Sequence, residues 1–62
     1  MLDAKVKELI NKQINQEFYS EYLYLAFANY FYDNGLDGFA NWYDVQAQEE
    51  RDHAMLMRTY LH

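Results

Sequence analysis

Residues that interrupt helices are confined to one short segment of this chain. It contains no proline, and its two glycines, Gly35 and Gly38, both lie in the segment Asp-Asn-Gly-Leu-Asp-Gly. Proline and glycine cost the most free energy in a helix interior, and every other stretch of the sequence is compatible with a helix. The pattern therefore predicts one helix at about 3–34, a turn at 35–37 and a second helix at about 38–62.

The glycine segment also indicates how the two helices are connected. Gly35 suits the left-handed backbone position that commonly ends a helix, and Asp37 suits the N-cap of the next helix. Because the connection is short, the two helices should pack against each other in opposite directions. We therefore expect an all-α fold, an antiparallel helical hairpin, in one domain that covers residues 1–62.

The chain has more apolar residues than one hairpin can bury. Hydrophobic residues make up 52% of the sequence and aromatic residues 19%, although 62 residues form at most one small domain. The run 22–32, Tyr-Leu-Tyr-Leu-Ala-Phe-Ala-Asn-Tyr-Phe-Tyr, is broken only by Asn29. A helix that is apolar all round is buried on several sides, and this run is too short for a membrane span. The excess therefore predicts further protein partners, either more copies of the chain or the remainder of the same fold.

Charge and cysteine content exclude several classes of function. The formal net charge is −5, from ten acidic and five basic residues, whereas nucleic-acid binding needs a basic face. There is no cysteine for a disulfide or for a thiolate metal site. The sequence lacks a secretory-type basic stretch followed by an apolar segment, and it lacks an apolar run of membrane length. We expect a cytoplasmic protein with neither nucleic acid nor membrane as a partner.

Three side chains form the most informative group in the sequence. Glu50 and His53 make a Glu-x-x-His unit, and residues at i and i+3 lie on one face of a helix. Glu17 lies in the first predicted helix. Glu17 and His53 are each 18 residues from Gly35, which places both roughly 27 Å from the turn at a rise of about 1.5 Å per residue. The three side chains should therefore face each other at the same height in the hairpin.

These donor groups predict a metal site. Each buried carboxylate costs on the order of several kcal/mol unless its charge is neutralised, and a divalent cation supplies that neutralisation. Carboxylate oxygens combined with an imidazole suit iron, manganese or zinc. Iron(II) is favoured by a carboxylate-rich set with room for oxygen. The all-α bundles that hold two irons take a Glu from each of two helices and a Glu-x-x-His unit from each of the other two. This chain carries half of that set.

The second predicted helix has one apolar face and one polar face. We expect the apolar face to carry Phe39, Trp42, Gln46, Glu49, Glu50, His53, Met57 and Tyr60. We expect the solvated side to carry Asn41, Asp44, Gln48, Arg51, Asp52 and Arg58. Phe39 and Trp42 are expected to be core or subunit contacts. Glu21, one turn after Glu17, is expected to face solvent or to pair with a neighbour.

Several adjacent segments resemble the first two helices of the bacterial non-haem ferritins. Residues 15–20, Asn-Gln-Glu-Phe-Tyr-Ser, and 22–25, Tyr-Leu-Tyr-Leu, are similar to the first helix of that family. Residues 38–42, Gly-Phe-Ala-Asn-Trp, and 46–54, Gln-Ala-Gln-Glu-Glu-Arg-Asp-His-Ala, are similar to the second. The resemblance runs the length of the chain but covers less than half of a ferritin subunit. It implies that the hairpin forms half of a ferritin-like four-helix bundle.

The resemblance also implies a function. Ferritins store iron: a di-iron centre with ferroxidase activity oxidises Fe(II) with oxygen or peroxide, and Fe(III) is kept as a mineral inside a protein shell. The family resemblance implies a homo-oligomeric shell of 24 subunits. Haem-binding relatives carry a methionine inside the Glu-x-x-His segment, whereas this chain has Asp52 there. Haem is therefore not expected.

Individual roles follow from the same resemblance. Glu17 corresponds to the carboxylate on one iron of the ferroxidase centre, Glu50 to the carboxylate that bridges the two irons, and His53 to the imidazole on the first. Glu49 corresponds to an acid used by an accessory third iron. Tyr24 corresponds to a tyrosine beside the centre that donates a hydrogen bond and an electron.

The remaining ligands are not in this sequence, which leaves alternatives open. The chain is either part of a longer subunit or half of a bundle that a second copy completes, as in the two-helix encapsulated ferritins. We favour the longer subunit, because the match is to full-length ferritins and the second predicted helix ends without a cap. A structural helical hairpin without redox activity and a di-iron oxygenase or peroxidase relative are the rival functions.

Overall fold

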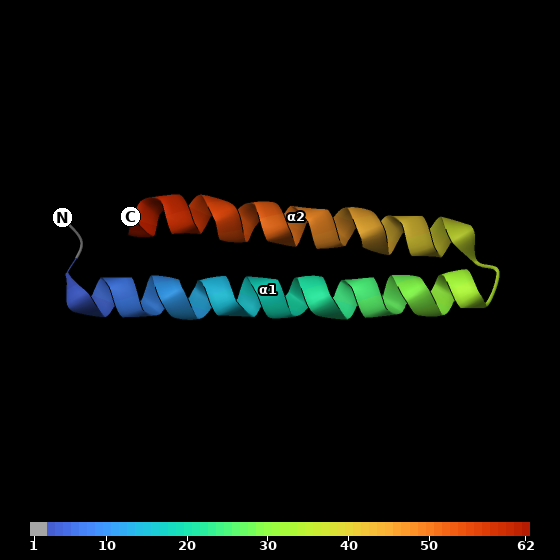
Figure 1. Cartoon of the computed structure of the whole chain (residues 1–62), viewed down its shortest axis with the longest axis horizontal. Helices are drawn as coiled ribbons and strands as arrows, with labels where there is room; N and C mark the ends of the chain where they lie inside the picture. The colour runs from blue at the N-terminus through green and yellow to red at the C-terminus, as the bar shows by residue number, and fades with distance from the viewer. Residues whose placement is uncertain (1–2) are drawn as a thin grey trace.

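The chain folds as a pair of long helices. A computed structural model describes residues 3–62, so the predicted domain begins two residues before the described range. Helix α1 covers Ala4–Asp33 and helix α2 covers Asp37–Leu61. They lie side by side in opposite directions, with the start of α1 and the end of α2 at one end and the turn at the other (Figure 1). The predicted all-α antiparallel hairpin is therefore confirmed.

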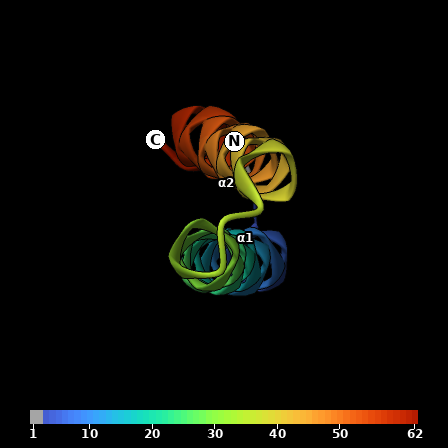
Figure 2. The same cartoon turned by 90° about the vertical axis from the view of Figure 1, so that its right-hand side faces the viewer.

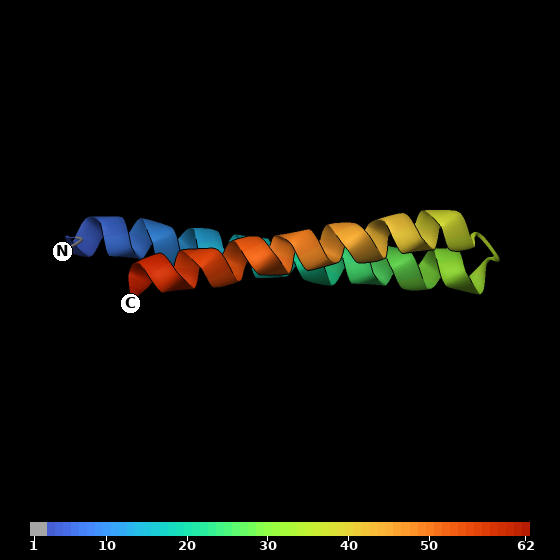
Figure 3. The ribbon, with the colours of Figure 1, turned by 90° about the horizontal axis from the view of Figure 1, so that it is seen from above.

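The two helices remain adjacent over most of their length. The Cα atoms extend over 49 × 13 × 10 Å. Viewed from the turn, the helices form a single pair with the connection between them (Figure 2). Viewed from above, α2 crosses α1 at a shallow angle (Figure 3). Within residues 3–62, neither helix has both the length and the apolar character that are needed to cross a bilayer.

The turn closes the end of α1 with a regular hydrogen-bond pattern. The backbone N–H of Leu36 donates to the carbonyl of Phe31 at 2.8 Å, and that of Gly35 donates to Tyr32 at 3.1 Å. This paired arrangement is the Schellman motif, which needs a residue in the left-handed conformation just after the helix. Gly35 fills that position with a φ of 73°, as its place in the sequence predicted.

The start of α2 differs from the expected one. Asp37 is the first residue of the helix, and Leu36 occupies the N-cap position without a side-chain hydrogen bond. The prediction of Asp37 as the N-cap was therefore wrong by one residue. Leu36 donates the last hydrogen bond of the Schellman motif and directly precedes Asp37. The turn therefore has no further residue that could cap α2. The Asp37 carboxylate still interacts favourably with the positive end of the helix dipole.

The contact between the helices follows a regular seven-residue pattern. The side chains that are buried or half-buried at alternating spacings of three and four define the seam of the hairpin. Its residues are Ile10, Ile14, Glu17, Glu21, Tyr24, Ala28 and Phe31 from α1, and Ala40, Tyr43, Ala47, Glu50, Ala54, Met57 and Leu61 from α2. This spacing is that of coiled coils, whose contact positions average 3.5 residues apart.

Small residues dominate the most buried positions of the seam. Ala40, Ala47 and Ala54 are spaced seven residues apart and are at most 2% exposed. The distance between packed helices depends on the side chains at the contact, so this row of alanines lets α2 lie close to α1. The larger seam residues Tyr24 and Tyr43 pack against each other with ring centroids 5.9 Å apart.

Many of the aromatic residues lie outside the seam. Fifteen large hydrophobic side chains among residues 3–62 are exposed, which agrees with the expected excess of apolar surface. Phe39 and Trp42 are 62% and 55% exposed, so they are not part of the hairpin core. The predicted apolar face of α2 therefore combines two features, the seam itself and a neighbouring exposed row. Phe39, Gln46, His53 and Tyr60 form that row at a spacing of seven residues, each directly before Ala40, Ala47, Ala54 or Leu61 of the seam; Gln46 is half-buried and the other three are exposed.

The two glycines make a matched test of the turn. Gly35 has a positive φ, whereas Gly38 lies inside α2, and an added Cβ meets no atom within 4 Å at either position. Gly35→Ala is expected to lower the free energy of unfolding by about 1–2 kcal/mol, because alanine is strained in the left-handed region. Gly38→Ala is expected to raise it by about 0.5–1 kcal/mol, because alanine is the better helix former. Urea unfolding of both variants measures this, and equal effects of the same sign would contradict the described turn.

Candidate metal centre

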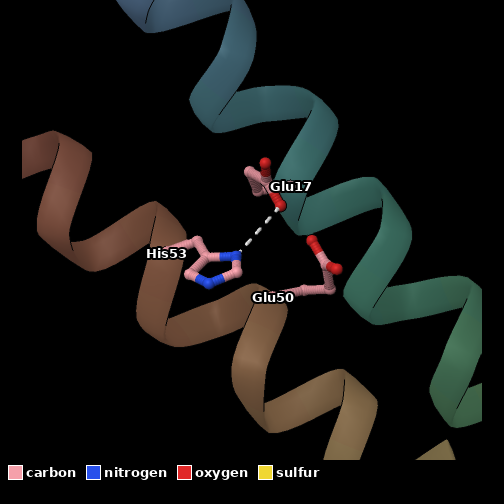
Figure 4. A group of neighbouring side chains, drawn as sticks. All are labelled: Glu17, Glu50 and His53. Carbon is pink, nitrogen blue, oxygen red and sulfur yellow. Dashed lines mark ion pairs between the residues drawn. The ribbon is translucent and has the colours of Figure 1, made fainter.

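Glu17, Glu50 and His53 converge between the two helices. Glu17 comes from α1, and the other two come from successive turns of α2 (Figure 4). One potential ligand atom from each lies within 4.8 Å of the others. Among residues 3–62, this is the only such group of three acidic or histidine side chains. The equal distances from Gly35 in the sequence do bring these residues to one height.

Their positions follow from the seam. Glu17 and Glu50 occupy contact positions that, apart from Glu21, apolar or aromatic residues hold elsewhere along the hairpin, and both are half-buried. The Glu17 side chain is 14% exposed, whereas His53, in the row beside the seam, is 59% exposed. The site therefore has a covered side formed by the seam and an open side at His53.

Two further contacts orient the Glu17 carboxylate. Its Oε1 atom accepts a hydrogen bond of 3.0 Å from the side-chain amide of Gln13, one turn earlier on α1. Its Oε2 atom lies 3.9 Å from Nδ1 of His53. The contact with Gln13 was not predicted, although glutamine and glutamate four residues apart on a helix are suitably spaced for it.

The carboxyl groups of Glu17 and Glu50 are close enough to share a proton when one of them is protonated. A hydrogen bond between their carboxyl groups raises the pKa of Glu50, and the desolvation of Glu50 raises it further. The same hydrogen bond lowers the pKa of Glu17, with smaller contributions in that direction from Gln13 and His53. Two neighbouring carboxylates repel each other when both are ionised, so a proton on one of them is favoured. A divalent cation at this position would replace that proton.

The donor set fits a transition-metal ion. Bonds from such an ion to histidine nitrogen or carboxylate oxygen are about 2.0–2.2 Å, so two donors on one ion are at most about 4.4 Å apart. The ligand atoms here lie within 4.8 Å of each other, so only a small closing movement is needed. Two carboxylates and one imidazole suit iron, manganese or zinc. They also leave coordination positions open on the exposed side.

The other two predicted site residues lie outside the converging group. Glu49 is exposed, and its charge contributes to the raised pKa of the adjacent Glu50. Tyr24 is a half-buried seam residue about 10 Å along α1 from Glu17, at seven residues of helical rise. Its ring packs against Tyr43.

A second ionic contact, between Glu21 and Arg51, lies next to the converging group. Glu21 lies in the seam one turn beyond Glu17 and is 18% exposed, and its carboxylate is 3.9 Å from the guanidinium of Arg51. Glu21 thus pairs with a neighbour, one of the two expected outcomes. Arg51 was expected to be solvated, and its side chain is about half exposed despite this contact.

Comparisons with known proteins agree with the resemblance in the sequence. The Ferritin-like domain family matches residues 7–62. A protein named bacterial non-heme ferritin from Campylobacter jejuni is 44% identical over 61 residues, which cover 98% of this chain and 36% of the relative. Proteins of the same name from Bacteroides fragilis and Staphylococcus saprophyticus are 43% and 41% identical, again over 98% of the chain and over 38% and 36% of their own lengths.

The chain therefore spans between about a third and two fifths of the length of these curated relatives. No solved structure matches it at a significant level.

The shared proton predicts how stability depends on pH. Because the pKa of Glu50 is raised above its ordinary value of 4.5, the folded protein keeps this proton to higher pH than the unfolded chain does. The stabilisation is complete below pH 4.5 and is lost as pH rises through the raised pKa. The lowered pKa of Glu17 acts in the opposite direction and only below 4.5, where its stabilisation is lost as pH falls.

Glu50→Gln keeps a hydrogen-bond donor toward Glu17 at every pH. In metal-free protein, this variant is therefore expected to lose less stability than the wild type between about pH 4.5 and 7. Urea unfolding across that range tests the expectation, with the exposed Glu8→Gln as the matched control. A wild-type stability curve parallel to that of Glu50→Gln would contradict the shared proton.

Proposed function

Because the chain belongs to the ferritin family, we propose that it supplies half of a di-iron ferroxidase centre in an iron-storage protein. The observation that carries the proposal is the convergence of Glu17, Glu50 and His53 in the seam of the hairpin. The proposed activity is the oxidation of Fe(II) by oxygen or peroxide, followed by storage of Fe(III) as mineral in a protein shell. Iron is both substrate and cargo in this activity.

The geometry supports a division of roles among the three residues. Glu17 Oε2 and His53 Nδ1 are 3.9 Å apart, a separation that suits two donors on one iron. Glu50 shares the site with both and is proposed to bridge that iron and a second one. When Fe(II) binds, the proton shared by Glu17 and Glu50 leaves, and both carboxylates then neutralise positive charge. Each Fe(II) supplies one electron to the oxidant, while the protein holds the ions in place.

The other two residues have supporting roles in the proposal. Glu49 is exposed beside Glu50, where a carboxylate is accessible to an accessory third iron. Tyr24 is proposed to donate a hydrogen bond and an electron near the centre. Tyr24 lies in the same seam as Glu17, about 10 Å along α1 toward the turn, and its role is proposed from the family resemblance.

The missing ligands must approach from the open side of the site. The exposed row of α2 with His53 carries Phe39 and Tyr60, and Trp42 lies next to Phe39 on the same side. On α1, Phe27 contacts Tyr43 edge to face. We call the surface formed by these exposed residues the open face. Two more helices packed on it would bury its apolar side chains and bring the second Glu and the second Glu-x-x-His unit.

We propose that the rest of a longer subunit supplies these two helices, because the matched segment covers only 36% and 38% of two of the relatives. The alternative is a second copy of the hairpin, which would add another Glu17, Glu50 and His53. The intact mass of the natural protein separates the two. A value well above 7.5 kDa favours the longer subunit.

Exposed apolar residues elsewhere support assembly into a shell. Tyr19, Tyr22 and Val45 are about half exposed or more, and they lie away from the row that contains His53. Exposed apolar surface that is spread over several sides of a small domain marks protein contacts. The proposed assembly is a homo-oligomer of 24 subunits, as the family resemblance implies.

The main rival is a structural hairpin that associates through its aromatic residues without redox activity. In that case the oxidation of Fe(II) would not depend on Glu17, Glu50 or His53. The half-buried pair of carboxylates weighs against the rival, because a purely structural seam is better served by apolar residues of similar volume.

Glu50→Ala and His53→Ala test the proposal in the whole protein. Each is expected to slow the initial oxidation of Fe(II) by more than about 100-fold, the upper loss observed when only an outer partner of a ligand is removed. Stopped-flow absorbance after mixing with Fe(II) in air measures the rate, and circular dichroism checks the fold. Asp52→Ala, in the same turn of α2 and exposed, is the matched control. Wild-type rates in both ligand variants would refute the assignment.

A further inference from the structure

Among residues 3–62, Gln13 is the one residue outside the converging group whose side chain donates a hydrogen bond into it. Its Nε2 atom donates to Oε1 of Glu17 at 3.0 Å. The two residues are four positions apart on α1, so their side chains lie on adjacent turns of one face. Gln13 also lines a groove with Leu9, Ile10, Met57 and Tyr60. Tyr60 belongs to the same row of α2 as His53, so Gln13 lies on the side of the hairpin where His53 is exposed.

The two oxygens of the Glu17 carboxylate consequently have different partners. Oε1 is held by the amide of Gln13, and Oε2 is turned toward His53 Nδ1. A carboxylate that is free to rotate can bind a metal ion through either oxygen or through both. The amide contact opposes that rotation, because turning the carboxylate about its last bond away from the present orientation would break the 3.0 Å hydrogen bond.

We propose that Gln13 is a positioning residue that presents Oε2 of Glu17 to the metal as a single, monodentate ligand. The inference rests on the proposed function, since it takes Glu17 as a metal ligand. Gln13 itself touches neither substrate nor the reacting atoms. It acts through Glu17, as the hydrogen-bonded outer partners of metal ligands commonly do.

The chemistry of an amide suits this task. A glutamine side chain donates a hydrogen bond at every pH and carries no charge. It therefore orients the carboxylate without neutralising it. A lysine or arginine at this position would form an ion pair with Glu17, as Arg51 does with Glu21. Such a side chain would compete with the metal cation for the carboxylate.

The test compares two isosteric changes in the whole protein. Gln13→Met keeps the length, the helix propensity and the apolar stem of the side chain but removes the donor. Gln16→Met makes the same change at an exposed position one turn further along α1. Because methionine suits both the helix and the groove beside Gln13, loss of fold is not expected in either variant.

Two measurements with Zn²⁺, which is redox-inactive, report on positioning. The dissociation constant comes from competition with a chromophoric chelator. The separation between the asymmetric and symmetric carboxylate stretches comes from infrared difference spectra of protein labelled with ¹³C-glutamate. A monodentate carboxylate gives a wide separation and a bidentate one a narrow separation. A residue with only a packing role would leave this separation unchanged.

Gln13→Met is expected to weaken Zn²⁺ binding by about tenfold, the lower end of the range for loss of an outer partner. It should also narrow the stretch separation of one glutamate, while Gln16→Met matches the wild type in both measurements. Unchanged values in Gln13→Met would overturn the inference. Weaker binding with an unchanged separation would also overturn it, because Gln13 would then act through packing alone.

Glu50→Ala in the same titration separates this inference from the proposed function. If Glu50→Ala greatly weakens Zn²⁺ binding and Gln13→Met does not, only the positioning role is wrong. If Glu50→Ala binds Zn²⁺ as the wild type does, the metal site itself is wrong, and the role of Gln13 is overturned with it.

Discussion

Glu17 and Glu50 occupy the contact seam between closely packed helices, and the rest of the site depends on this constraint. Apart from these two and Glu21, the seam is built from apolar and aromatic residues, with Ala47 and Ala54 almost fully buried on either side of Glu50. Carboxylates in such a position need compensation, because desolvation disfavours their charged form. In metal-free protein, the hydrogen bond between the two carboxyl groups raises the pKa of Glu50, and the contacts of Glu17 to Gln13 and His53 favour the ionised form of Glu17. A divalent cation would compensate both charges at once.

The same seam explains why the group of Glu17, Glu50 and His53 is covered on one side and open on the other. The alanine row draws α2 against α1, so the seam covers one side of Glu17 and Glu50. His53 projects from the row beside the seam and remains 59% exposed. Its neighbours in that direction, Phe39, Trp42 and Tyr60, are also exposed. An open group of carboxylates and imidazole beside uncovered aromatic residues is what the proposed half of a four-helix bundle would present, and the proposed function depends on the helices that would cover it.

Much of this arrangement could be predicted from the sequence, because it depends on spacing. The position of the two glycines determined the number of helices, and the left-handed Gly35 was identified from residue type alone. The equal distances of Glu17 and His53 from the turn predicted their convergence without any side-chain detail.

Features that depend on the exact rotation of each helix were harder to predict. Phe39 and Trp42 were assigned to one broad apolar face together with Glu50. Each directly precedes a seam residue in the sequence and therefore lies on a different side of the helix from the seam. Asp37 was expected to cap α2, but the hydrogen bonds of the turn place it inside the helix. Contacts such as Gln13 with Glu17 and Arg51 with Glu21 depend on side-chain rotamers, which spacing only permits.

Anomalous scattering at the iron edge, collected from crystals of the whole protein soaked in Fe(II), tests the central claim most directly. The account predicts a peak between the helices, about 2.0–2.2 Å from Glu17 Oε2 and His53 Nδ1. A second peak is predicted across Glu50 on the open face, and the groups on its far side would identify what completes the centre. Iron peaks elsewhere on the protein, with none between Glu17, Glu50 and His53, would contradict the account and leave the hairpin as a structural element.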